Sequence, residues 1–396
     1  MDILLTSLGS IGDINPMIGV GRALKNEGLR VRFITNGYFK VPLKKAGIDI
    51  IEIGDVRSYR RALSNHDLWD PLKGFKILQE EMFLPATLPV YECIKRNLSK
   101  RTLIISSPFA YGARMAHERF NVSGATIVLQ PSGLWATAQN IAPERLVKML
   151  DIVWGPKINR ARQSVGLPGF KNIFGEWIYS PQLVIGLFPK WFMPPNTRYP
   201  SNTRFTGFLG YDGPPSQGLK KEVKEFISKG DEPLLFTFGT EISGDDSFFE
   251  AIIGACRILK KRGIILTRNK SAIPGSLPKN MLHVDYLPFS KILPHVAAFV
   301  HHGGIGTIAQ GLAAGVPQLA IPRNLDQPFN AEMLRKVGVG TVLEPDGLDG
   351  KELAKKLRTL LTSTPIKNKC LSIAKKTDLD RGVLNVLSKL HETFKI

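Results

Sequence analysis

The chain has few cysteines and no hydrophobic run as long as a membrane span. Its three cysteines, Cys93, Cys256 and Cys370, are odd in number and widely spaced. This argues against a disulfide framework or a zinc site and suits a reducing compartment. No apolar run approaches the roughly 20 residues that a transmembrane helix needs. Met1–Ser7 has an acidic second residue and an apolar run too short for a signal peptide, so we expect a first strand there.

Several motifs of metal and nucleophile chemistry are also absent. The sequence contains no H-E-x-x-H, no Walker lysine loop, no paired cysteines and no G-x-S-x-G elbow. The acidic pattern Asp378–Asp380 lies in a basic C-terminal segment far from the glycine-rich turns, and we interpret it as chance spacing. We therefore predict no metal site.

Acidic residues are scarce relative to basic ones. The 34 Asp and Glu against 53 Lys and Arg give a net charge of +19. The basic residues are scattered and no recognition motif accompanies them, so we expect no nucleic-acid partner. Two interpretations stay open. One is peripheral contact with an anionic membrane, at the inner face of the plasma membrane, to which each nearby Lys or Arg contributes about 1 kcal/mol. The other is an ordinary basic surface of a cytoplasmic protein.

The length and the order of apolar runs predict two α/β domains. A chain of 396 residues is too long for one ordinary core. Short apolar runs alternate with helical patterns, and the first such helix is Pro16–Glu27. This alternation implies parallel sheets with right-handed crossovers, hence two Rossmann-like, doubly wound domains facing across a cleft. The candidate strands are Ile3–Ser7, Val31–Thr35, Ile50–Ile53, Thr102–Ser106, Gly124–Leu129, Leu183–Leu187, Leu234–Phe238, Gly263–Thr267, His283–Val284, Ala297–Val300, Gln318–Ile321 and Gly340–Leu343.

A polar stretch separates the two series of strands. Arg198–Pro215 is rich in Pro, Gly, Asn and Ser, which is typical of a connection between domains. We predict an N-terminal domain over 1–205, a linker region over 206–232 and a C-terminal domain over 233–380. We expect residues 381–396 to form a helix that packs back on the N-terminal domain.

The segment His301–Thr307 carries the strongest chemical signal. Two histidines, three glycines and a threonine directly follow an apolar strand. Glycines let a backbone approach an anion, and a helix N-terminus offers free N–H groups and partial positive charge. We predict a phosphate site here, with His302 contacting the anion and His301 pointing to the opposite face. The helix is expected to include Ile308–Ala314.

Two further turns follow predicted strands. Phe236–Thr240 ends in Gly239 and Thr240, which suit a phosphate or its neighbouring sugar, although glycine after a strand usually marks only a turn. Asp326 and Gln327 offer acceptors and donors for sugar hydroxyls, although for an isolated pair ordinary turn chemistry before Pro328 is the favoured interpretation. These turns fall at carboxyl ends of strands, where α/β sheets bind ligands.

The first turn, Leu8–Pro16, contains a lone carboxylate. It lacks the full G-x-G-x-x-G spacing, so dinucleotide binding is weakly supported. Asp13 stands three residues before Pro16, where its carboxylate either reaches a substrate or serves as the N-cap of the helix. Its position alone leaves the two roles open.

These motifs resemble those of the nucleotide-sugar glycosyltransferases of the GT-B fold, over nearly the whole sequence. The donor motif H-x-G-x-x-(S/T)…G-V-P…D-Q appears as His302–Thr307, Gly315–Pro317 and Asp326–Gln327, and Gly9–Pro16 matches the branch that has an Asp base. A closer resemblance is to the rhamnosyltransferases of rhamnolipid synthesis. It rests on Tyr59–Arg61, Leu68–Pro71, Ser180–Gln182 and Leu187–Phe192.

The resemblance implies an inverting transfer that needs no metal and no cofactor other than a dTDP- or UDP-sugar as co-substrate. Asp13 is then the base, and the donor-binding residues are Gly239, Thr240, Tyr286, Leu287, His302, Gly304, Gly306, Thr307, Gln310, Asp326 and Gln327. Many UDP-sugar members have Glu at the position of Gln310. An uncharged amide is a poorer bidentate acceptor for the ribose hydroxyls, which favours dTDP.

The sequence indicates less about the acceptor-binding residues than about the donor-binding ones. All five tryptophans lie in the first half of the sequence. Most aromatic residues fill cores, and a few line apolar pockets. We expect a lipid or other lipophilic acceptor, with a pocket formed by Ser10, Trp69, Phe83 and Trp135. Two alternatives stay open: a non-catalytic sugar-nucleotide-binding or helper subunit, and a GT-B epimerase that hydrolyses its donor.

Overall fold

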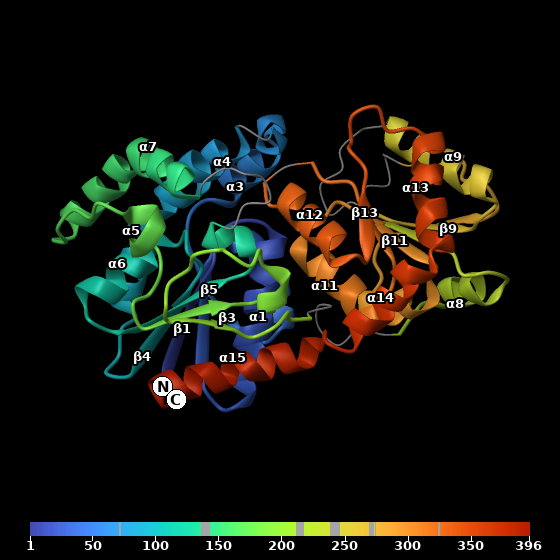
Figure 1. Cartoon of the computed structure of the whole chain (residues 1–396). Helices are drawn as coiled ribbons and strands as arrows, with labels where there is room; N and C mark the ends of the chain where they lie inside the picture. The colour runs from blue at the N-terminus through green and yellow to red at the C-terminus, as the bar shows by residue number, and fades with distance from the viewer. Residues whose placement is uncertain are drawn as a thin grey trace. The chain divides into compact units, whose positions relative to one another are not determined.

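Two parallel β-sheets with flanking helices form the computed structural model (Figure 1). It describes residues 1–70, 73–135, 143–210, 218–237, 246–268, 273, 275–323 and 325–396. The chain divides into two compact units: unit 1 is Met1–Pro214 with Asp380–Ile396, and unit 2 is Pro215–Leu379. The predicted class, two Rossmann-like α/β domains, is confirmed.

Unit 1 contains a seven-stranded sheet in the order β3-β2-β1-β4-β5-β6-β7. All neighbouring strands are parallel, and the central strand β4 is buried along its whole length. Such apolar runs pair in parallel because helices cover both faces of the sheet. The strands are β1 (Asp2–Thr6), β2 (Arg30–Thr35), β3 (Asp49–Glu52), β4 (Thr102–Ser106), β5 (Ser123–Val128), β6 (Leu183–Gly186) and β7 (Thr203–Phe205).

The helices of unit 1 connect these strands. From β1 the sheet extends first toward β3 and then from β4 toward β7, so right-handed crossovers place helices on both faces. The helices are α1 (Ile11–Asn26), α2 (Lys40–Lys45), α3 (Val56–Leu63), α4 (Gly74–Ile77), α5 (Leu84–Arg96), α6 (Tyr111–Arg119), α7 (Pro143–Ser164) and α15 (Leu379–Phe394). Two π-helical segments, η3 (Leu78–Phe83) and η5 (Ile173–Trp177), lie among them.

Helix α1 begins earlier than predicted. We placed its start at Pro16, but Ser10 is the N-cap and the helix starts at Ile11. Pro16 lies inside the helix, where it removes only the bond to the carbonyl of Gly12, and Gly12 lies in an exposed part of the first turn. Asp13 is therefore in the first turn and is not the N-cap.

Unit 2 contains a six-stranded parallel sheet in the order β10-β9-β8-β11-β12-β13. Its strands are β8 (Leu234–Thr237), β9 (Gly263–Leu266), β10 (Met281–Val284), β11 (Ala298–His301), β12 (Gln318–Ala320) and β13 (Gly340–Val342). Its helices are α8 (Lys221–Ser228), α9 (Asp246–Leu259), α10 (Phe289–Ile292), α11 (Ile305–Ala314), α12 (Gln327–Val337), α13 (Gly350–Thr362) and α14 (Thr364–Ala374). Helix α8 lies within the range 206–232 that we predicted as a linker region. Within the described residues of both units, no helix is long and apolar enough to span a membrane.

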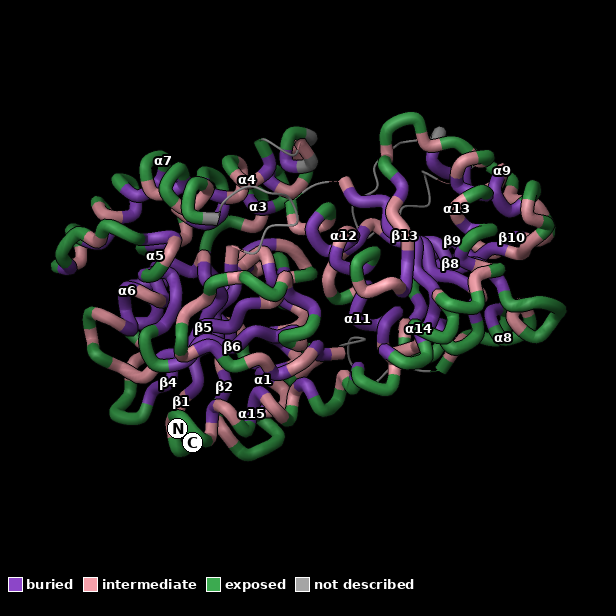
Figure 2. The backbone as a smooth tube through the Cα atoms, in the orientation of Figure 1, coloured by how far each residue is buried: buried purple, intermediate pink, exposed green. Residues whose placement is uncertain are grey.

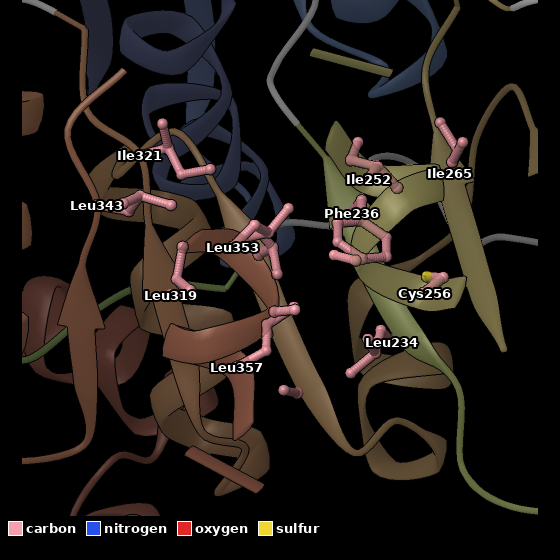
Figure 3. Packing of buried hydrophobic residues seen from close by; sticks show 14 of the residues in the cluster. Leu234, Phe236, Ile252, Cys256, Ile265, Leu319, Ile321, Leu343, Leu353 and Leu357 are labelled. Carbon is pink, nitrogen blue, oxygen red and sulfur yellow. The ribbon is translucent and has the colours of Figure 1, made fainter. Parts of the chain in front are cut away.

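Two hydrophobic clusters hold the sheet of unit 2 between its helices. In one cluster, Phe236 lies beside Ile252 and Cys256 of α9, and Leu353 of α13 packs near Leu319 (Figure 3). The other cluster covers the opposite face and includes Val223 of α8 and Phe299 of β11. The strands form the buried centre of each unit, while exposed residues lie on the outer helices and loops (Figure 2).

The last helix, α15, belongs to unit 1. The side-chain amide of Asn385 donates to the carbonyl of Thr206 at 2.9 Å, and the His391 imidazole lies 2.8 Å from the Glu27 carboxylate. Gly382 allows the close approach, because a Cβ there would lie 1.9 Å from the Phe208 carbonyl oxygen. Both chain ends therefore lie in unit 1 (Figure 1).

Candidate functional site

Each sheet has one point at which the strand order reverses, and the predicted site residues gather there. In unit 1 this point lies between β1 and β4, and Asp13 follows β1. In unit 2 it lies between β8 and β11, and His302 follows β11. Ligands of open α/β sheets bind at such switch points, beyond the carboxyl ends of the strands. Each unit therefore presents a candidate site of its own.

The carboxylate of Asp13 is fixed by the turn that precedes α1. Its Oδ2 accepts hydrogen bonds from the backbone N–H of Ser10 at 2.7 Å and from the Ser10 hydroxyl at 3.2 Å. Ser10 in turn caps the helix by accepting from the N–H of Gly12, which completes a capping box. Ser10, predicted to line an acceptor pocket, therefore holds the carboxylate in place.

Burial shifts the acid strength of this carboxylate. Desolvation raises the pKa of Asp13 from 3.8 to about 6, and the hydrogen bonds from Ser10 oppose the rise. A carboxylate with a pKa just below neutrality is ionised at pH 7 and still basic enough to take a proton. This is the property that a general base needs.

The turn around Asp13 depends on a glycine and a tyrosine. Gly9 has a φ of +123°, and a Cβ at this position would lie 2.4 Å from Oδ2 of Asp13, so only glycine leaves room for the carboxylate. The hydroxyl of Tyr59 in α3 donates to the carbonyl of Gly9. Tyr59 therefore ties a second element to the turn, a contact that the sequence pattern did not indicate.

Aromatic side chains gather beside the neighbouring strand end. Phe109 follows β4 and is partly exposed; Phe83 stacks on it with ring centroids 5.1 Å apart, and Trp135 meets it edge-on at 6.5 Å. Phe83 and Trp135, two predicted acceptor-pocket residues, are thus brought together by a residue that we had not singled out. The Trp69 side chain lies outside the described residues. A strand followed at once by Ser-Pro-Phe was the available signal for Phe109.

A serine hydroxyl at the same strand end has no bonding partner. Oγ of Ser107, directly after β4, is buried without a hydrogen bond in the described part of the protein, while its backbone N–H donates to the Thr6 carbonyl of β1. An unpaired buried hydroxyl is costly unless a ligand or water satisfies it. It is a candidate contact for a polar group of a bound molecule.

The turn after β11 places His302 against the N-terminus of α11. Gly304 is the N-cap, so Gly306 and Thr307 lie in the first turn, where backbone N–H groups lack helical partners. The helix starts three residues before the segment that we predicted. A Cβ on Gly304 would lie 2.6 Å from Nε2 of His302, and Gly303 has a φ of +88°. The glycines therefore let the imidazole lie against the helix terminus.

The imidazole of His302 is neutral at pH 7. Burial, with a smaller effect from the Arg323 guanidinium, lowers the pKa of His302 to about 4. Its Nδ1 is buried and has no hydrogen-bond partner among the described residues. A neutral imidazole binds an anion by donating an N–H, so His302 fits the role of an N–H donor. Arg323, which the sequence analysis missed, follows β12 and places a permanent positive charge near His302.

His301 has a structural role, as its position predicted. Its Nε2 lies 2.9 Å from Oε1 of Gln318, and its Nδ1 accepts from the N–H of Gly303 at 3.0 Å. Burial lowers the pKa of His301 to about 3, so this ring is also neutral. His301 thereby holds the turn on which His302 stands.

Asp326 and Gln327 lie beside the same turn. Asn330 of α12 is fully buried, and its Nδ2 donates both to the carbonyl of Gly303 at 3.2 Å and to Oδ2 of Asp326 at 2.5 Å. The side-chain oxygen of Gln327 accepts from the backbone N–H of Arg323 at 2.9 Å. The structure thus brings together the two motifs that we predicted to share a ligand, and Asn330 is the link that we missed.

The remaining predicted donor residues differ in exposure. Tyr286, after β10, is 44% exposed, and the Arg268 guanidinium lies 5.9 Å from its ring centre. The side chain of Leu287 packs in the core, so it is not available to line a pocket as we predicted. Gln310 is buried within α11. Gly239 and Thr240 lie outside the described residues.

Two family models match the protein. The Glycosyltransferase family 28 N-terminal domain matches residues 3–138, and the Erythromycin biosynthesis protein CIII-like C-terminal domain matches residues 260–390. The first match includes the Asp13 turn and the second includes the His302 turn. Each candidate site therefore lies within the match of a different family model.

Relatives of established name align with almost the whole sequence. The chain is 25% identical to O-mycaminosyltylonolide 6-deoxyallosyltransferase of Streptomyces fradiae, over 99% of this chain and 97% of the relative. It is 26% identical to sterol 3-beta-glucosyltransferase of Saccharomyces cerevisiae strain YJM789, over 98% of this chain and 34% of the relative. The chain thus spans about a third of the yeast protein.

Solved structures share the fold. The glycosyltransferase of kitacinnamycin superposes with a TM-score of 0.78 at 18% identity, over 99% of this chain and 98% of that chain. The glycosyltransferase VinC, solved in complex with dTDP, gives a TM-score of 0.72 at 17% identity over the whole length of both proteins.

Proposed function

Because the chain is a nucleotide-sugar glycosyltransferase of the GT-B type, we propose that it is an inverting, metal-independent enzyme acting on a lipophilic alcohol. The donor is a hexose or deoxyhexose linked to dTDP or UDP. The acceptor is a hydroxyl of a lipid or another lipophilic molecule. The single observation that carries the proposal is the His302 turn, where an unpaired imidazole nitrogen meets a helix N-terminus.

The donor diphosphate binds at the start of α11. Backbone N–H groups of the first turn, with Gly304, Gly306 and Thr307, bind the phosphate oxygens. His302 donates an N–H, and Arg323 adds positive charge nearby. Asp326 and Gln327 bind the sugar hydroxyls. The bonds of Asn330 to Asp326 and to Gly303, and the bond from Arg323 to Gln327, support this role.

The same groups stabilise the leaving diphosphate. As the bond between the anomeric carbon and the phosphate oxygen breaks, negative charge grows on that oxygen. Fixed N–H donors at a helix terminus offset this charge without reorganising. Transfer is therefore expected to continue in the presence of EDTA.

Asp13 activates the acceptor. Its carboxylate takes the proton of the acceptor hydroxyl as the oxygen attacks the anomeric carbon from the side opposite the diphosphate, which inverts the configuration. A positioned base of this kind contributes roughly 10²–10⁴-fold to the rate. The raised pKa of Asp13 and the bonds from Ser10 support this role.

The base of the nucleotide is proposed to contact Tyr286 and the backbone of Leu287, and Gln310 to contact the ribose. An amide at Gln310 favours a sugar without a 2′-hydroxyl, hence dTDP. VinC bound to dTDP supports this choice. So does the resemblance of Tyr59–Arg61 to the rhamnosyltransferases, which points to a dTDP-rhamnose type of donor, with UDP-glucose as the alternative.

The acceptor site is proposed at the end of β4. Phe83, Phe109 and Trp135 supply apolar surface, and the unpaired hydroxyl of Ser107 supplies one polar contact. The similarity to a sterol glucosyltransferase supports a lipophilic alcohol. The net charge of +19 supports a peripheral contact with an anionic membrane.

A thermal-shift panel of dTDP- and UDP-sugars tests donor binding first. A ligand at about 100 times its Kd stabilises the folded state by about 2.7 kcal/mol. The best donor is then incubated with a sterol or a long-chain hydroxy lipid, and NMR of the product reports the anomeric configuration. We expect inversion, and transfer at least about 100-fold slower in Asp13→Asn, although that variant still binds the donor. Retention of configuration, or donor hydrolysis without transfer, would contradict the proposal.

A further inference from the structure

The outer side of helix α7 exposes three neighbouring apolar residues. Met149, Ile152 and Val153 are 52%, 68% and 49% exposed. Spacings of three and four residues place them together on one face of the helix. Isolated exposed apolar residues are common, but three on one face form a surface patch. Figure 2 shows exposed stretches recurring along α7 in unit 1.

The opposite side of α7 is fully engaged in unit 1. Leu150, Trp154, Ile158 and Arg162 are buried, and Arg162 forms a bidentate pair with Glu118 at 2.8 and 3.1 Å. These contacts fix which face of the helix points inward. The apolar patch is therefore a stable outer surface, because the helix has a separate face for its own core.

Positive charges surround the patch. Arg145 and Lys148 precede it and Arg160 follows it; all three are exposed and have no acidic partner among the described residues. The two acidic residues of the helix are already bonded. Glu144 pairs with Arg198, and Asp151 accepts from the backbone N–H of Phe174. The outer face thus combines apolar residues with uncompensated positive charge.

Helix α4 packs against the inward side of α7. Phe75 of α4 packs edge-on against Trp154 of α7, with ring centroids 5.5 Å apart. Lys76, next to Phe75, is exposed. Lys157 of α7, in contrast, is paired with Glu80 of η3 at 3.2 Å.

We propose that the outer face of α7 docks on an anionic lipid surface. Met149, Ile152 and Val153 enter the headgroup region, and Arg145, Lys148 and Arg160 contact lipid phosphates, as in interfacial amphipathic helices. The proposal rests on the proposed function, because a membrane is where a lipophilic alcohol is found. A second copy of the protein fits this face poorly, because it would bring the same basic residues together.

Vesicle co-sedimentation of the full-length protein tests the proposal. Wild type is mixed with vesicles of phosphatidylcholine alone, or of phosphatidylcholine with 30 mol% phosphatidylglycerol. We expect binding to the anionic vesicles only, weakened by salt. The variant Met149→Gln/Ile152→Gln/Val153→Gln is expected to weaken binding at least about ten-fold. The loss of one positive charge lowers the affinity for anionic vesicles about five-fold. Lys148→Glu/Arg160→Glu is therefore expected to lower that affinity at least about 25-fold.

Matched controls change exposed residues of the same kind elsewhere. Leu384→Gln in α15 removes an apolar side chain that is 61% exposed, and Lys224→Glu in α8 reverses an exposed charge. Each control is expected to bind vesicles within about two-fold of wild type. Circular dichroism and thermal unfolding confirm that every variant folds.

Three outcomes would overturn the proposal. The first is that wild type does not bind anionic vesicles. The second is that the α7 variants and the controls lose the same amount of vesicle binding. The third is that wild type is a dimer and the apolar variant is a monomer. Donor thermal shifts of the same variants separate this proposal from the proposed function. If vesicle binding depends on α7 but no sugar nucleotide shifts the melting temperature, the proposed function is refuted and the membrane-docking proposal stands. If a sugar nucleotide shifts the melting temperature but the α7 variants bind vesicles as well as wild type, the docking proposal is refuted and the proposed function stands.

Discussion

Replacing Asp13 by asparagine is expected to stabilise unit 1 at alkaline pH while abolishing transfer. Burial raises the pKa of Asp13 from 3.8 to about 6. Between these values the folded protein holds a proton that the unfolded chain releases, so stability falls as the pH rises through this range. Above pH 6 the ionised carboxylate costs about 3 kcal/mol of folding free energy. Asparagine mimics the protonated acid and avoids this cost at every pH.

The expected gain therefore depends on pH. The free energy of unfolding of Asp13→Asn should exceed that of wild type by about 3 kcal/mol at pH 8 and by about 1 kcal/mol at pH 4.5. Urea unfolding followed by tryptophan fluorescence measures unit 1 selectively, because all five tryptophans lie within it. The amide oxygen can still accept from the Ser10 N–H, which preserves the capping box. Transfer should fall at least about 100-fold with donor affinity unchanged.

Asp55→Asn is the matched control with the opposite sign. Asp55 caps α3, and its bond from the backbone N–H of Ser58 lowers the pKa of this exposed carboxyl. The ionised Asp55 carboxylate stabilises the folded state at neutral pH, and this stabilisation is lost on acidification. Asp55→Asn should therefore show no increase in the free energy of unfolding at pH 8. The reasoning would be refuted if Asp13→Asn were no more stable than wild type at pH 8. Transfer at the wild-type rate would remove Asp13 from the role of base.

Three further predictions follow from the two sites. Binding of dTDP or UDP should raise the pKa of His302 from about 4, because the diphosphate offsets the effect of burial; an NMR titration that shows no change with nucleotide bound would contradict the contact. Gly306→Ala should stabilise unit 2 by about 0.5–1 kcal/mol, since alanine favours helix and its Cβ meets nothing within 4 Å, yet weaken donor binding at least about ten-fold in calorimetry. Tyr59→Phe should destabilise unit 1 by about 1 kcal/mol in urea unfolding and lower kcat without changing donor affinity, because the turn before Asp13 loses one anchor; an unchanged kcat would make Tyr59 purely structural.

Much of the fold was predictable because most of its strands are buried. Runs such as Thr102–Ser106 have an apolar centre and are buried throughout, and their alternation with helices leaves parallel pairing as the simplest arrangement. The start of α1 was missed because Pro16 marks a helix start in most contexts. The spacing of Ser10 and Asp13 carried the better signal, since the two residues form a capping box.

The candidate sites were predictable only where their residues are contiguous in sequence. Strand ends locate His302 and Asp326, but only the folded protein shows that Asn330 joins their turns. Phe109 belongs to the acceptor side through its stacking on Phe83, and the Ser-Pro-Phe turn after β4 was its only local signal. Arg323 belongs to the donor side through its charge near His302, and no local pattern marks it. Leu287 was assigned to the nucleobase pocket by the family resemblance alone, whereas its side chain packs in the core after β10.

The return of α15 to the first unit has a consequence for synthesis of the protein. The carbonyl of Thr206 receives its bond from Asn385 only after 179 further residues have been made. The segment that forms unit 2 is contiguous and leaves the ribosome before α15, so it can fold while the first unit still lacks its final helix. A nascent chain stalled before Asp380 should therefore be sensitive to proteases in the half that was translated first.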